Sequence, residues 1–460
     1  MPLLDPADSR PIHFVGVAGA GMSGLAELLA RRGARVTGCD PVLAGAADLV
    51  QLGVELHEGH DPAHVDGARA VVVTSAVPKD HPELARAREL GIPVIRRAEA
   101  LGEATAGGAL VGIAGTHGKT TTTVMTTDAL AAAGLAPTGV AGGRVARWGS
   151  NLSFGSDRLF VVEADEYDRS FLALTPTVAV VTNVEADHLD IYADLADIRA
   201  TFARFLAPAR YVVLCADDDG ANTLPTPSTT EVIRYGVTSP DARLVGEIGP
   251  GVEGGTRVKV TFDGEHLGTM QLRVPGVHNV RNALAAVGAG LALGSDLDAM
   301  RAGLEGFGGV ERRFQRLGIA RGVLVVDDYA HHPTEIEATL SAARAAYPTR
   351  RLVIAFQPHL YSRTRDFADR FGHALAAADA VFLTEIYPAR EQPLPGISAS
   401  LIADALRGAS AAALAWRGER GDLAAALADF VQPNDVVLTV GAGDITRTGP
   451  ELLGRLGDSR

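Results

Sequence analysis

The stretch from Val111 to Thr123 constrains the fold of this chain more than any other. It reads as an apolar strand, a glycine turn from Gly115 to Gly118, and a threonine-rich helix start. Small residues let backbone N–H groups close around anionic oxygens, and the helix N-terminus adds the positive end of its dipole. In open α/β sheets ligands bind at the carboxyl ends of strands. The stretch therefore predicts an α/β sheet with a phosphate site.

Lysine usage strengthens this interpretation. The motif is shorter than the usual P-loop, because a glycine five residues before Gly118 would fall on Ile113. A bare Gly-Lys-Thr is also weak evidence, since a lysine in a surface turn is usually solvated. However, Lys and Arg together number 42, and the only lysines are Lys79, Lys119 and Lys259. A chain that uses arginine almost everywhere keeps lysine in this loop, which favours a nucleotide phosphate site.

A second glycine turn lies near the N-terminus. Gly19-x-Gly21-x-x-Gly24 follows the apolar run 12–17 and matches the dinucleotide fingerprint. Asp40 ends the next expected strand, at the distance where an acid usually meets a ribose. The same turn holds any pyrophosphate, so it does not by itself indicate NAD. Further strands are expected at 71–75 and 93–95.

Two acidic clusters follow expected strands of the central segment. The strand 159–162 leads into residues 163–168, and the strand 178–182 leads into residues 183–190, which include His188. Carboxylates beside a phosphate loop repel one another unless a cation lies between them, and oxygen ligands suit Mg²⁺. A solvated acidic loop is the alternative for either cluster alone. His188 could orient a ligand or a water instead of binding the metal.

Polar residues also mark the later segments. Asn279 and Asn282 share one face of an expected helix ending near residue 293 and could read a nucleobase edge, with helix capping by Asn279 as the alternative. After a glycine-rich joint at 306–309, two expected strands end in polar runs that contain His331, His359 and Arg363. These side chains would suit a carboxylate ligand.

Length and composition bound the class of protein. The 460 residues favour roughly three domains. The net charge of −13 argues against a nucleic-acid partner. No apolar run reaches membrane-spanning length and the N-terminus has no signal-peptide pattern, so we expect a cytoplasmic protein without a membrane partner. Cys39 and Cys215 are too few and too far apart for a disulfide framework or a zinc motif, which favours a role as small hydrophobic residues.

Ordered motifs from His13 to about Asp444 carry a close resemblance to the Mur ligase superfamily. They are HFVGVAGAGMSGLAELL, GTHGKTTTT, EADEYDRSFL, TNVEADHLD, VPGVHNVRNALAA, RRFQ, DDYAHHPTE and FQPHLYSRT. The resemblance implies an α/β protein of three domains. These are a Rossmann-like UDP-sugar domain (1–105), a central P-loop-type ATPase domain with a mostly parallel sheet (106–310), and a Rossmann-like amino-acid domain (311–460).

The activity that the resemblance implies is an ATP-dependent carboxylate–amine ligase. It would join L-alanine to the lactyl carboxylate of UDP-N-acetylmuramate through an acyl phosphate, releasing ADP and phosphate, in peptidoglycan precursor synthesis. ATP and Mg²⁺ are the expected cofactors, and a monomer or weak homodimer is expected.

The resemblance also implies roles for individual residues. The implied catalytic residues are Lys119, Glu163, His188 and Arg313. The implied ATP contacts are Gly115, Thr116, His117, Gly118, Lys119, Thr120, Thr121, Asn279, Asn282, Arg313 and Asp328, and the implied metal ligands are Thr120, Glu163 and His188. UDP-sugar contacts are expected at Gly19, Ala20, Gly21, Met22, Ser23, Asp40 and Ser75, and amino-acid contacts at Tyr329, His331, His359 and Arg363.

Two departures from the family pattern stand out. Several members hold a metal through a carbamylated lysine, but this chain has no lysine between Lys119 and Lys259. Leu360 stands where many alanine ligases have arginine. Two rival functions remain: an NAD(P)-binding protein built on the first glycine turn, and a ligase that adds a recycled tripeptide to the same sugar.

Overall fold

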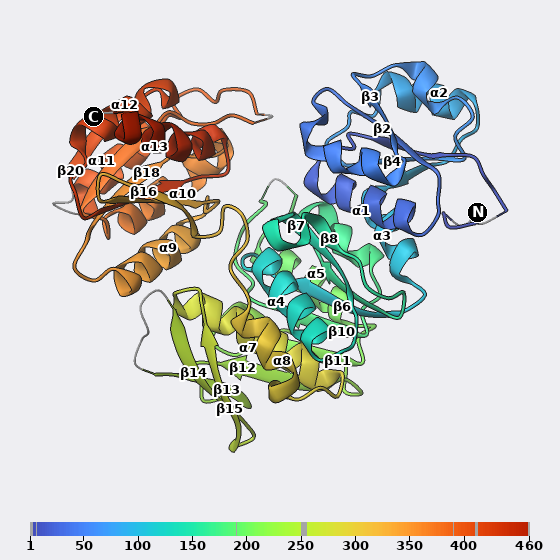
Figure 1. The fold of residues 1–460 in the computed structure, drawn as a ribbon, viewed down its shortest axis with the longest axis horizontal. Helices are drawn as coiled ribbons and strands as arrows, with labels where there is room; N and C mark the ends of the chain where they lie inside the picture. The colour runs from blue at the N-terminus through green and yellow to red at the C-terminus, as the bar shows by residue number, and fades with distance from the viewer. Residues whose placement is uncertain are drawn as a thin grey trace. The chain divides into compact units, whose positions relative to one another are not determined.

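The computed structural model describes residues 3–5, 7–189, 191–249, 255–389, 391–409 and 413–458. The chain forms two compact units. The first comprises Met1–Pro250, Arg257–Leu272 and Val280–Phe307, and the second comprises Gly251–Thr256, Arg273–Asn279 and Gly308–Arg460. The first unit holds two β-sheets and the second holds one, as the three differently coloured parts of Figure 1 show.

The N-terminal sheet is entirely parallel, in the order β3-β2-β1-β4-β5. Its strands are β1 (Ile12–Val15), β2 (Val36–Asp40), β3 (Glu55–Glu58), β4 (Ala70–Val73) and β5 (Val94–Arg96). The connections contain α1 (Ala20–Arg31), η1 (Leu43–Leu52), η2 (Pro62–Val65), α2 (Pro82–Glu89) and α3 (Arg97–Thr105). The strand order reverses direction beside β1, so the glycine turn after β1 lies at the point where such sheets bind ligands.

The central sheet is larger and mixed, in the order β15-β14-β13-β12-β11-β10-β6-β9-β7-β8. Its strands are β6 (Ala109–Ala114), β7 (Thr138–Val145), β8 (Ser150–Ser153), β9 (Leu159–Glu163), β10 (Val178–Val181), β11 (Tyr211–Cys215), β12 (Glu231–Gly236), β13 (Leu244–Ile248), β14 (Thr256–Phe262) and β15 (Glu265–Leu272). The strands from β7 to β13 in this order are parallel, whereas β7–β8 and β13–β14 pair antiparallel.

Helices of the central part are α4 (Lys119–Ala132), α5 (Leu195–Leu206), α6 (Asp219–Asn222), α7 (Val277–Ala292) and α8 (Leu297–Glu305), with 3₁₀ segments at η3 (Ala146–Trp148) and η4 (Tyr167–Ala173). Strands β6, β9 and β10 are apolar and buried along almost their whole length, as expected for parallel strands covered on both faces. By contrast, β14 alternates buried and exposed residues, which is typical of a strand with one covered face.

The sheet of the second unit has the order β16-β17-β21-β18-β19-β20, with all pairs parallel except β16–β17. Its strands are β16 (Gln315–Ala320), β17 (Val323–Asp328), β18 (Arg351–Phe356), β19 (Ala380–Thr384), β20 (Ala413–Gly418) and β21 (Asp435–Val440). One face packs against α9 (Pro333–Ala346), α10 (Tyr361–Leu375) and α11 (Ser400–Ala409). The other face packs against α12 (Arg420–Phe430) and α13 (Thr448–Asp458), with η5 (Asp444–Arg447) between.

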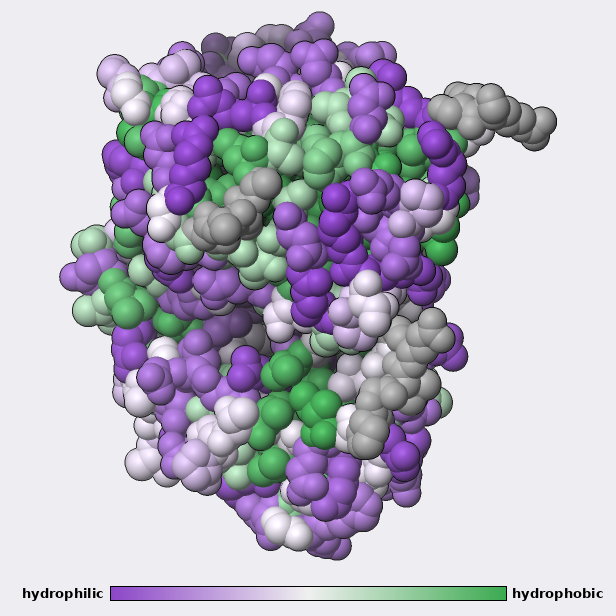
Figure 2. Space-filling view, turned by 90° about the vertical axis from the view of Figure 1, so that its left-hand side faces the viewer, coloured by the Kyte–Doolittle hydropathy of each residue, from purple (hydrophilic) through white to green (hydrophobic). Residues whose placement is uncertain are grey.

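The predicted fold class is confirmed, since three mostly parallel α/β sheets are present. The domain boundaries at 105/106 and 310/311 stay predictions. Within the described part of the chain, no helix is both long and apolar enough to cross a membrane. On the face that Figure 2 shows, hydrophobic side chains form separate patches among hydrophilic ones.

Candidate active site

The predicted phosphate loop joins the end of β6 to the start of α4. Gly115 and Gly118 have φ angles of 139° and 81°, a conformation that side chains rarely adopt. The loop is fixed to the end of β10, because Asn183 Oδ1 accepts the His117 N–H at 2.8 Å and the Asn183 carbonyl accepts the Thr116 N–H at 3.1 Å. The first N–H groups of α4 therefore open toward a site of fixed shape.

Lys119 lies within this loop and forms a buried ion pair. Its Nζ donates to the Gly115 carbonyl at 2.7 Å and to Glu166 Oε2 at 2.8 Å and Oε1 at 3.0 Å. The side chains of Lys119 and Glu166 are 14% and 4% exposed. Sequence reasoning named the acidic cluster but gave Glu166 no role of its own.

The ion pair and its burial shift the pKa values of both Lys119 and Glu166. Burial alone would lower the pKa of Lys119, but the carboxylates of Glu166 and Asp165 outweigh it and hold the pKa above its usual value. Burial raises the pKa of Glu166 to about 7, against the opposing effect of Lys119. A cation with three donors is thus held at the N-terminus of α4, where it can meet phosphate oxygens.

Glu163 lies on the other side of the helix start. Its Oε1 accepts from Thr120 Oγ1 at 3.0 Å, and its Oε2 accepts from the Gly142 N–H at 2.6 Å. A Cβ at Gly142 would lie 2.6 Å from Glu163 Oε1, so glycine is needed for this approach. The predicted ligands Thr120 and Glu163 are therefore adjacent. Their carboxylate and hydroxyl oxygens are hard donors that fit Mg²⁺.

His188 lies at a different point of the cluster. Its Nε2 is 3.7 Å from Glu166 Oε1 and 3.8 Å from Asp187 Oδ2, and its ring contacts Tyr167 edge-on. The structure thus separates the predicted metal ligands, because Thr120 is beside Glu163 whereas His188 is beside Glu166. Asp190, the last residue of the second acidic motif, lies outside the described residues.

The predicted base-reading asparagines are both on α7. Asn279 is the third residue of the helix, so the capping alternative is wrong, and its Nδ2 donates to the Pro275 carbonyl at 2.8 Å. Asn282 Oδ1 accepts from Thr122 Oγ1 at 3.1 Å, and a Cβ at Gly118 would lie 2.7 Å from that oxygen. Asn282 is therefore packed directly against the phosphate loop.

The first glycine turn opens into a cleft of about 380 Å³ inside the first unit. The cleft runs from the turn to the central sheet, and it is lined among others by Gly19, Ala20, Gly21, Met22, Thr74, Arg97, Gly142 and Glu163. A Cβ at Gly21 would lie 2.7 Å from Arg97 Nη1, which places a guanidinium over the turn. Sequence reasoning missed Arg97, since no motif marks an arginine that reaches the turn from α3.

Other predicted sugar residues lie around the same turn. Asp40 Oδ2 accepts the Ala18 N–H at 3.1 Å, and its Oδ1 accepts the Val42 N–H at 3.0 Å. Ser23 donates to the Ala20 carbonyl, and Asn151 of the central sheet donates to the same oxygen at 2.6 Å. Ser75 is exposed beside Thr74 and Ala76, which line the cleft.

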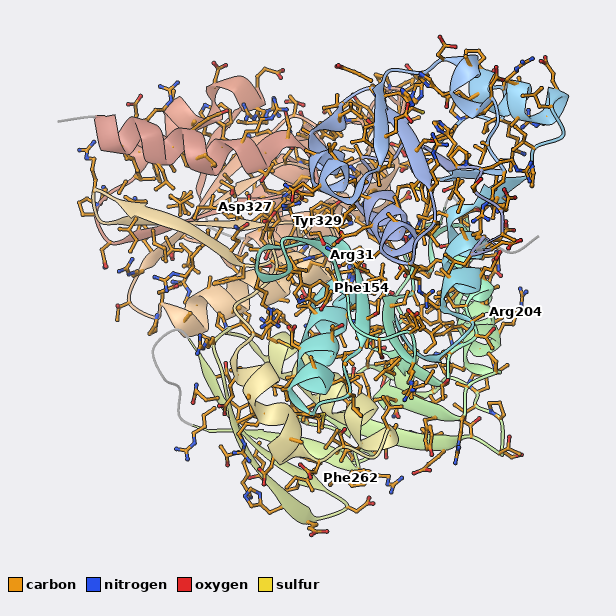
Figure 3. The ribbon with its side chains drawn as sticks, turned by 45° about the vertical axis from the view of Figure 1, so that its right-hand side comes forward. Arg31, Phe154, Arg204, Phe262, Asp327 and Tyr329 are labelled. Atoms are coloured by element: carbon orange, nitrogen blue, oxygen red, sulfur yellow. The ribbon has the colours of Figure 1, made fainter. Side chains whose placement is uncertain are left out.

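In the second unit, Asp328 ends β17 as a buried carboxylate. It accepts the Phe314 N–H at 2.7 Å and the Ala330 N–H at 2.8 Å. Burial raises its pKa to about 6, although Arg313 lowers it. Arg313 lies 3.4 Å from Glu335 and its guanidinium lies over the Tyr329 ring at 5.2 Å. Figure 3 labels Tyr329 beside Asp327 at the end of β17.

The predicted amino-acid residues follow β17 and β18. The His331 ring lies 5.2 Å from the Tyr329 ring and 6.0 Å from the His359 ring. Arg363 is in the first turn of α10 and only 7% exposed. Leu360 precedes that helix, and its N–H donates to the Tyr387 carbonyl at 3.0 Å.

Several non-glycine residues next to these groups have left-handed backbone angles. The φ angles are 54° at His188, 58° at Arg312, 50° at Phe314 and 73° at Leu360. Such conformations cost free energy for residues with a Cβ and persist where the surroundings impose them.

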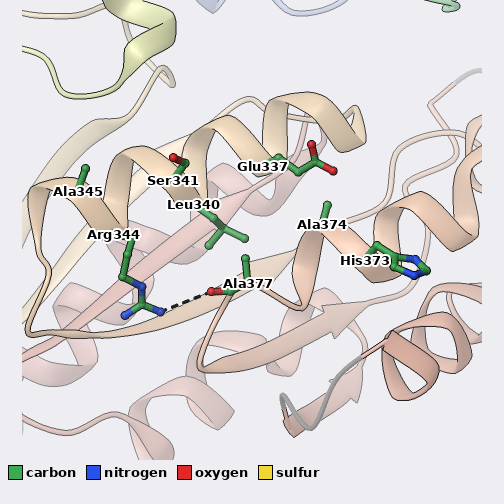
Figure 4. A pocket seen from close by; sticks show the side chains of 8 residues that line it. All are labelled: Glu337, Leu340, Ser341, Arg344, Ala345, His373, Ala374 and Ala377. Carbon is green, nitrogen blue, oxygen red and sulfur yellow. Dashed lines mark hydrogen bonds between the residues drawn. The ribbon is translucent and has the colours of Figure 1, made fainter. Parts of the chain in front are cut away.

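A second hollow of about 660 Å³ lies between α9 and α10 of the second unit. Glu337, Arg344 and His373 are among its lining residues, and Arg344 donates to the Ala377 carbonyl (Figure 4). It is lined by none of the predicted site residues.

Comparison with known families agrees with this geometry. Residues 11–108 match the description "Mur ligase family, catalytic domain", residues 113–290 match "Mur ligase middle domain", and residues 312–443 match "Mur ligase, glutamate ligase domain". With a phosphate loop, a glycine-turn cleft and full-length relatives, the chain belongs to the Mur ligase family.

Its relatives narrow the comparison to one kind of ligase. A UDP-N-acetylmuramate–L-alanine ligase of Rubrobacter xylanophilus is 47% identical over 97% of this chain and all of that protein. The ligase of the same name from Salinibacter ruber is 45% identical over 95% of this chain and 93% of that protein. The crystal structure of UDP-N-acetylmuramate-alanine ligase from Thermotoga maritima has a TM-score of 0.82 at 29% identity, covering 98% of this chain and all of the other.

Proposed function

We propose that this chain uses ATP and Mg²⁺ to join L-alanine to the lactyl carboxylate of UDP-N-acetylmuramate, releasing ADP and phosphate. The reaction would be a step of peptidoglycan precursor synthesis in the cytoplasm. The names of the full-length relatives support both substrates. A monomer or weak homodimer stays a prediction.

The observation that carries the proposal is the cleft of the first unit. It is lined by the glycine turn at one end and by Glu163, the partner of Thr120, at the other. A UDP sugar with its pyrophosphate at Gly19 to Met22 and Arg97 would extend toward Glu163 and the start of α4. Its carboxylate would then lie near the phosphate loop, as transfer of a phosphoryl group to that carboxylate requires.

The residues of the loop have distinct tasks in this reaction. Lys119 neutralises charge on the transferred phosphoryl group, and the N–H groups of α4 bind its oxygens. Thr120 and Glu163 would hold Mg²⁺, which would supply positive charge that lowers the repulsion between the phosphates and the incoming carboxylate. Asn282, against the loop, and Asn279 contact the adenine.

The second half of the reaction forms an amide. The acyl phosphate is attacked by the alanine amine, and the tetrahedral adduct expels phosphate. Arg363, His331 and His359 bind the alanine carboxylate and orient the amine, while Arg313 and Asp328 contact ATP.

The two rival functions are less well supported. Two murein peptide ligases of known structure are 24% and 29% identical to this chain, whereas the alanine ligases match nearly all of it at 43% to 47%. An NAD(P)-binding protein would need neither Lys119 nor the oxygen cluster of Thr120 and Glu163.

Phosphate release tests the proposal directly. The enzyme is supplied with ATP, Mg²⁺ and UDP-N-acetylmuramate, and then with L-alanine, glycine, L-serine or the tripeptide L-alanyl-γ-D-glutamyl-meso-diaminopimelate. We expect phosphate only when sugar and amine are both present, and fastest with L-alanine. Faster release with the tripeptide would replace the proposal by the recycling reaction, and calorimetric binding of NAD without binding of the UDP sugar would refute it.

A further inference from the structure

Histidines gather on one face of the N-terminal sheet, away from the glycine turn. Registered neighbours of parallel strands point to the same face, so the pairs His13–Thr37 and Cys39–His57 lie on one face. This face is covered by η2, which carries His64, and by α2, which carries Glu83. Four segments far apart in the sequence therefore place nitrogen, sulfur and oxygen donors together.

The donors are close enough to share one ion. One ligand atom each from His13, Cys39, His64 and Glu83 lies within 4.8 Å of all the others. Glu83 Oε1 is 3.0 Å from His64 Nδ1, and Glu83 Oε2 is 3.1 Å from Cys39 Sγ and 3.8 Å from His13 Nε2. Ligands of a tetrahedral zinc lie about 3.3 to 3.7 Å apart, given the usual bond lengths.

An independent observation points to a ligand at this place. His13 is fully buried, and its Nε2 has no hydrogen-bond partner, since 3.8 Å to Glu83 is too long for one. Its other nitrogen, Nδ1, lies 2.8 Å from Thr37 Oγ1. If Nδ1–H donates to Thr37, then Nε2 presents its lone pair to the cluster, which is how a metal-binding histidine is normally oriented.

The charges of the donor set also match a divalent metal. A Cys39 thiolate and the Glu83 carboxylate supply two negative charges, and both histidines bind as neutral rings. Cys39 and Glu83 are buried, where a charge is stable only when it is paired or coordinated. The half-buried His64 gives the metal a way in from solvent.

We propose a Zn²⁺ site in the N-terminal sheet, with one ligand each from His13, Cys39, His64 and Glu83. Mixed nitrogen, sulfur and oxygen ligands favour Zn²⁺ over Mg²⁺, which prefers oxygen alone. The ion is structural, because all four coordination positions are filled by the protein and the ligands tie η2 and α2 to β1 and β2. Sequence reasoning treated Cys39 as a small hydrophobic residue, and no spacing motif links these four positions.

The alternative is a metal-free cluster in which Glu83 accepts hydrogen bonds from Cys39, His64 and the Asp61 N–H. Binding of Co²⁺ distinguishes the zinc site from the metal-free cluster, because Co²⁺ replaces Zn²⁺ in such sites. A cobalt–thiolate bond gives an intense absorption band in the near ultraviolet. The full-length protein is stripped with a chelator and titrated with Co²⁺ in excess Mg²⁺, which saturates the oxygen site of the phosphate loop. We expect one Co²⁺ per chain with a thiolate band, displaced by Zn²⁺.

Variants locate the site. Cys39→Ser is expected to abolish the thiolate band, and His64→Ala to weaken Co²⁺ binding by roughly a hundredfold or more. The matched controls, Cys215→Ser at the other buried cysteine and His266→Ala at an exposed histidine, are expected to bind like the parent protein. Circular dichroism of each stripped variant checks that it is folded.

Two results would overturn the proposal. One is a stripped parent protein that binds no Co²⁺ stoichiometrically or gives no thiolate band. The other is a thiolate band that survives in Cys39→Ser. If a variant fails to fold, the Co²⁺ titration of the parent protein alone decides whether the metal site exists. Zn²⁺ is also expected to raise the melting temperature of the parent protein but not that of folded Cys39→Ser.

Discussion

Replacing Lys119 is expected to reduce stability as well as activity, because its partner Glu166 is buried. In Lys119→Met the Glu166 carboxylate, 4% exposed, loses the cation at 2.8 Å. Breaking a buried pair on one side leaves an uncompensated charge and typically costs about 3 to 5 kcal/mol. The catalytic loss should be a hundredfold or more, because charge stabilisation of the phosphoryl group is removed.

The pKa of Glu166 gives the pH dependence of this loss. Its pKa is raised from the usual 4.5 to about 7 even with Lys119 present, and removing the lysine raises it further. The parent protein already carries the cost of this shift, which is about 3 kcal/mol at pH 7. A carboxyl group whose folded pKa is raised is least unfavourable below its unfolded pKa and destabilises the fold increasingly as pH rises. The further rise of this pKa in Lys119→Met should therefore increase the variant's loss of stability relative to the parent as pH rises above about 7, by up to about 1.4 kcal/mol for each pKa unit of that rise.

A double variant isolates the pair. Lys119→Met with Glu166→Gln removes both charges and should recover stability to within about 1 kcal/mol of the parent, while remaining inactive. Lys259→Met is the matched control, because Lys259 is paired with Glu247 on the surface and should change stability by less than about 0.5 kcal/mol.

Urea unfolding followed by fluorescence measures these values for the first unit. The chain has two tryptophans, Trp148 in the central part and Trp416 in the second unit. In a Trp416→Phe background the signal reports on Trp148 alone. A Lys119→Met variant as stable as the parent at pH 8, or a double variant no more stable than the single one, would refute the reasoning.

Three further predictions concern other parts of the molecule. Glu163→Gln should lower turnover roughly a hundredfold and raise the Mg²⁺ concentration that the enzyme requires. Gly142→Ala should act in the same direction, because the added Cβ would displace the Glu163 carboxylate. Near-parental rates of Glu163→Gln at saturating Mg²⁺ would show that Glu163 does not bind the metal. Backbone N–H groups and Arg281 outweigh burial and lower the pKa of Asp217 from 3.8 to about 2. The Asp217 carboxylate should therefore add about 2 kcal/mol to the free energy of unfolding above pH 4, and this contribution should be lost as pH falls toward 2. In urea unfolding, Asp217→Asn should lack this acid-dependent loss. Arg363→Ala should raise the KM for alanine far more than the KM for ATP or the UDP sugar. Leu360→Arg should change only the dependence of the rate on alanine. If Arg363→Ala changes only the KM for ATP, the alanine pocket has been assigned to the wrong residues.

The sequence predicted several of the parallel strands because strand, glycine turn and helix follow one another there. The strands β6, β9, β10 and β17 all lie where apolar runs precede a turn. Strands β11 to β15 were not predicted, although β14 alternates apolar and polar residues, because no strand was expected between the second acidic cluster and α7. The glycine-rich run 139–143 forms part of β7, where a missing Cβ lets Glu163 approach Gly142.

Candidate site residues in continuous motifs could be named from the sequence, but their partners could not. The acidic motif offers Glu163, Asp165 and Glu166, and only the fold decides that Lys119 pairs with Glu166 while Thr120 pairs with Glu163. Arg97 reaches the glycine turn from another helix, and the histidine cluster depends on strand register. Contacts of this kind, between residues far apart in the sequence, are set by the topology of the fold and not by the spacing of residues within a motif.

The positive φ angles at His188, Arg312, Phe314 and Leu360 have a consequence for directed evolution of this protein. Each such residue costs of order 1 to 3 kcal/mol, and glycine would adopt the same angles without that cost. A selection for heat resistance alone should therefore favour glycine at these positions. It would remove side chains beside the predicted site residues, so thermal tolerance would rise as turnover fell.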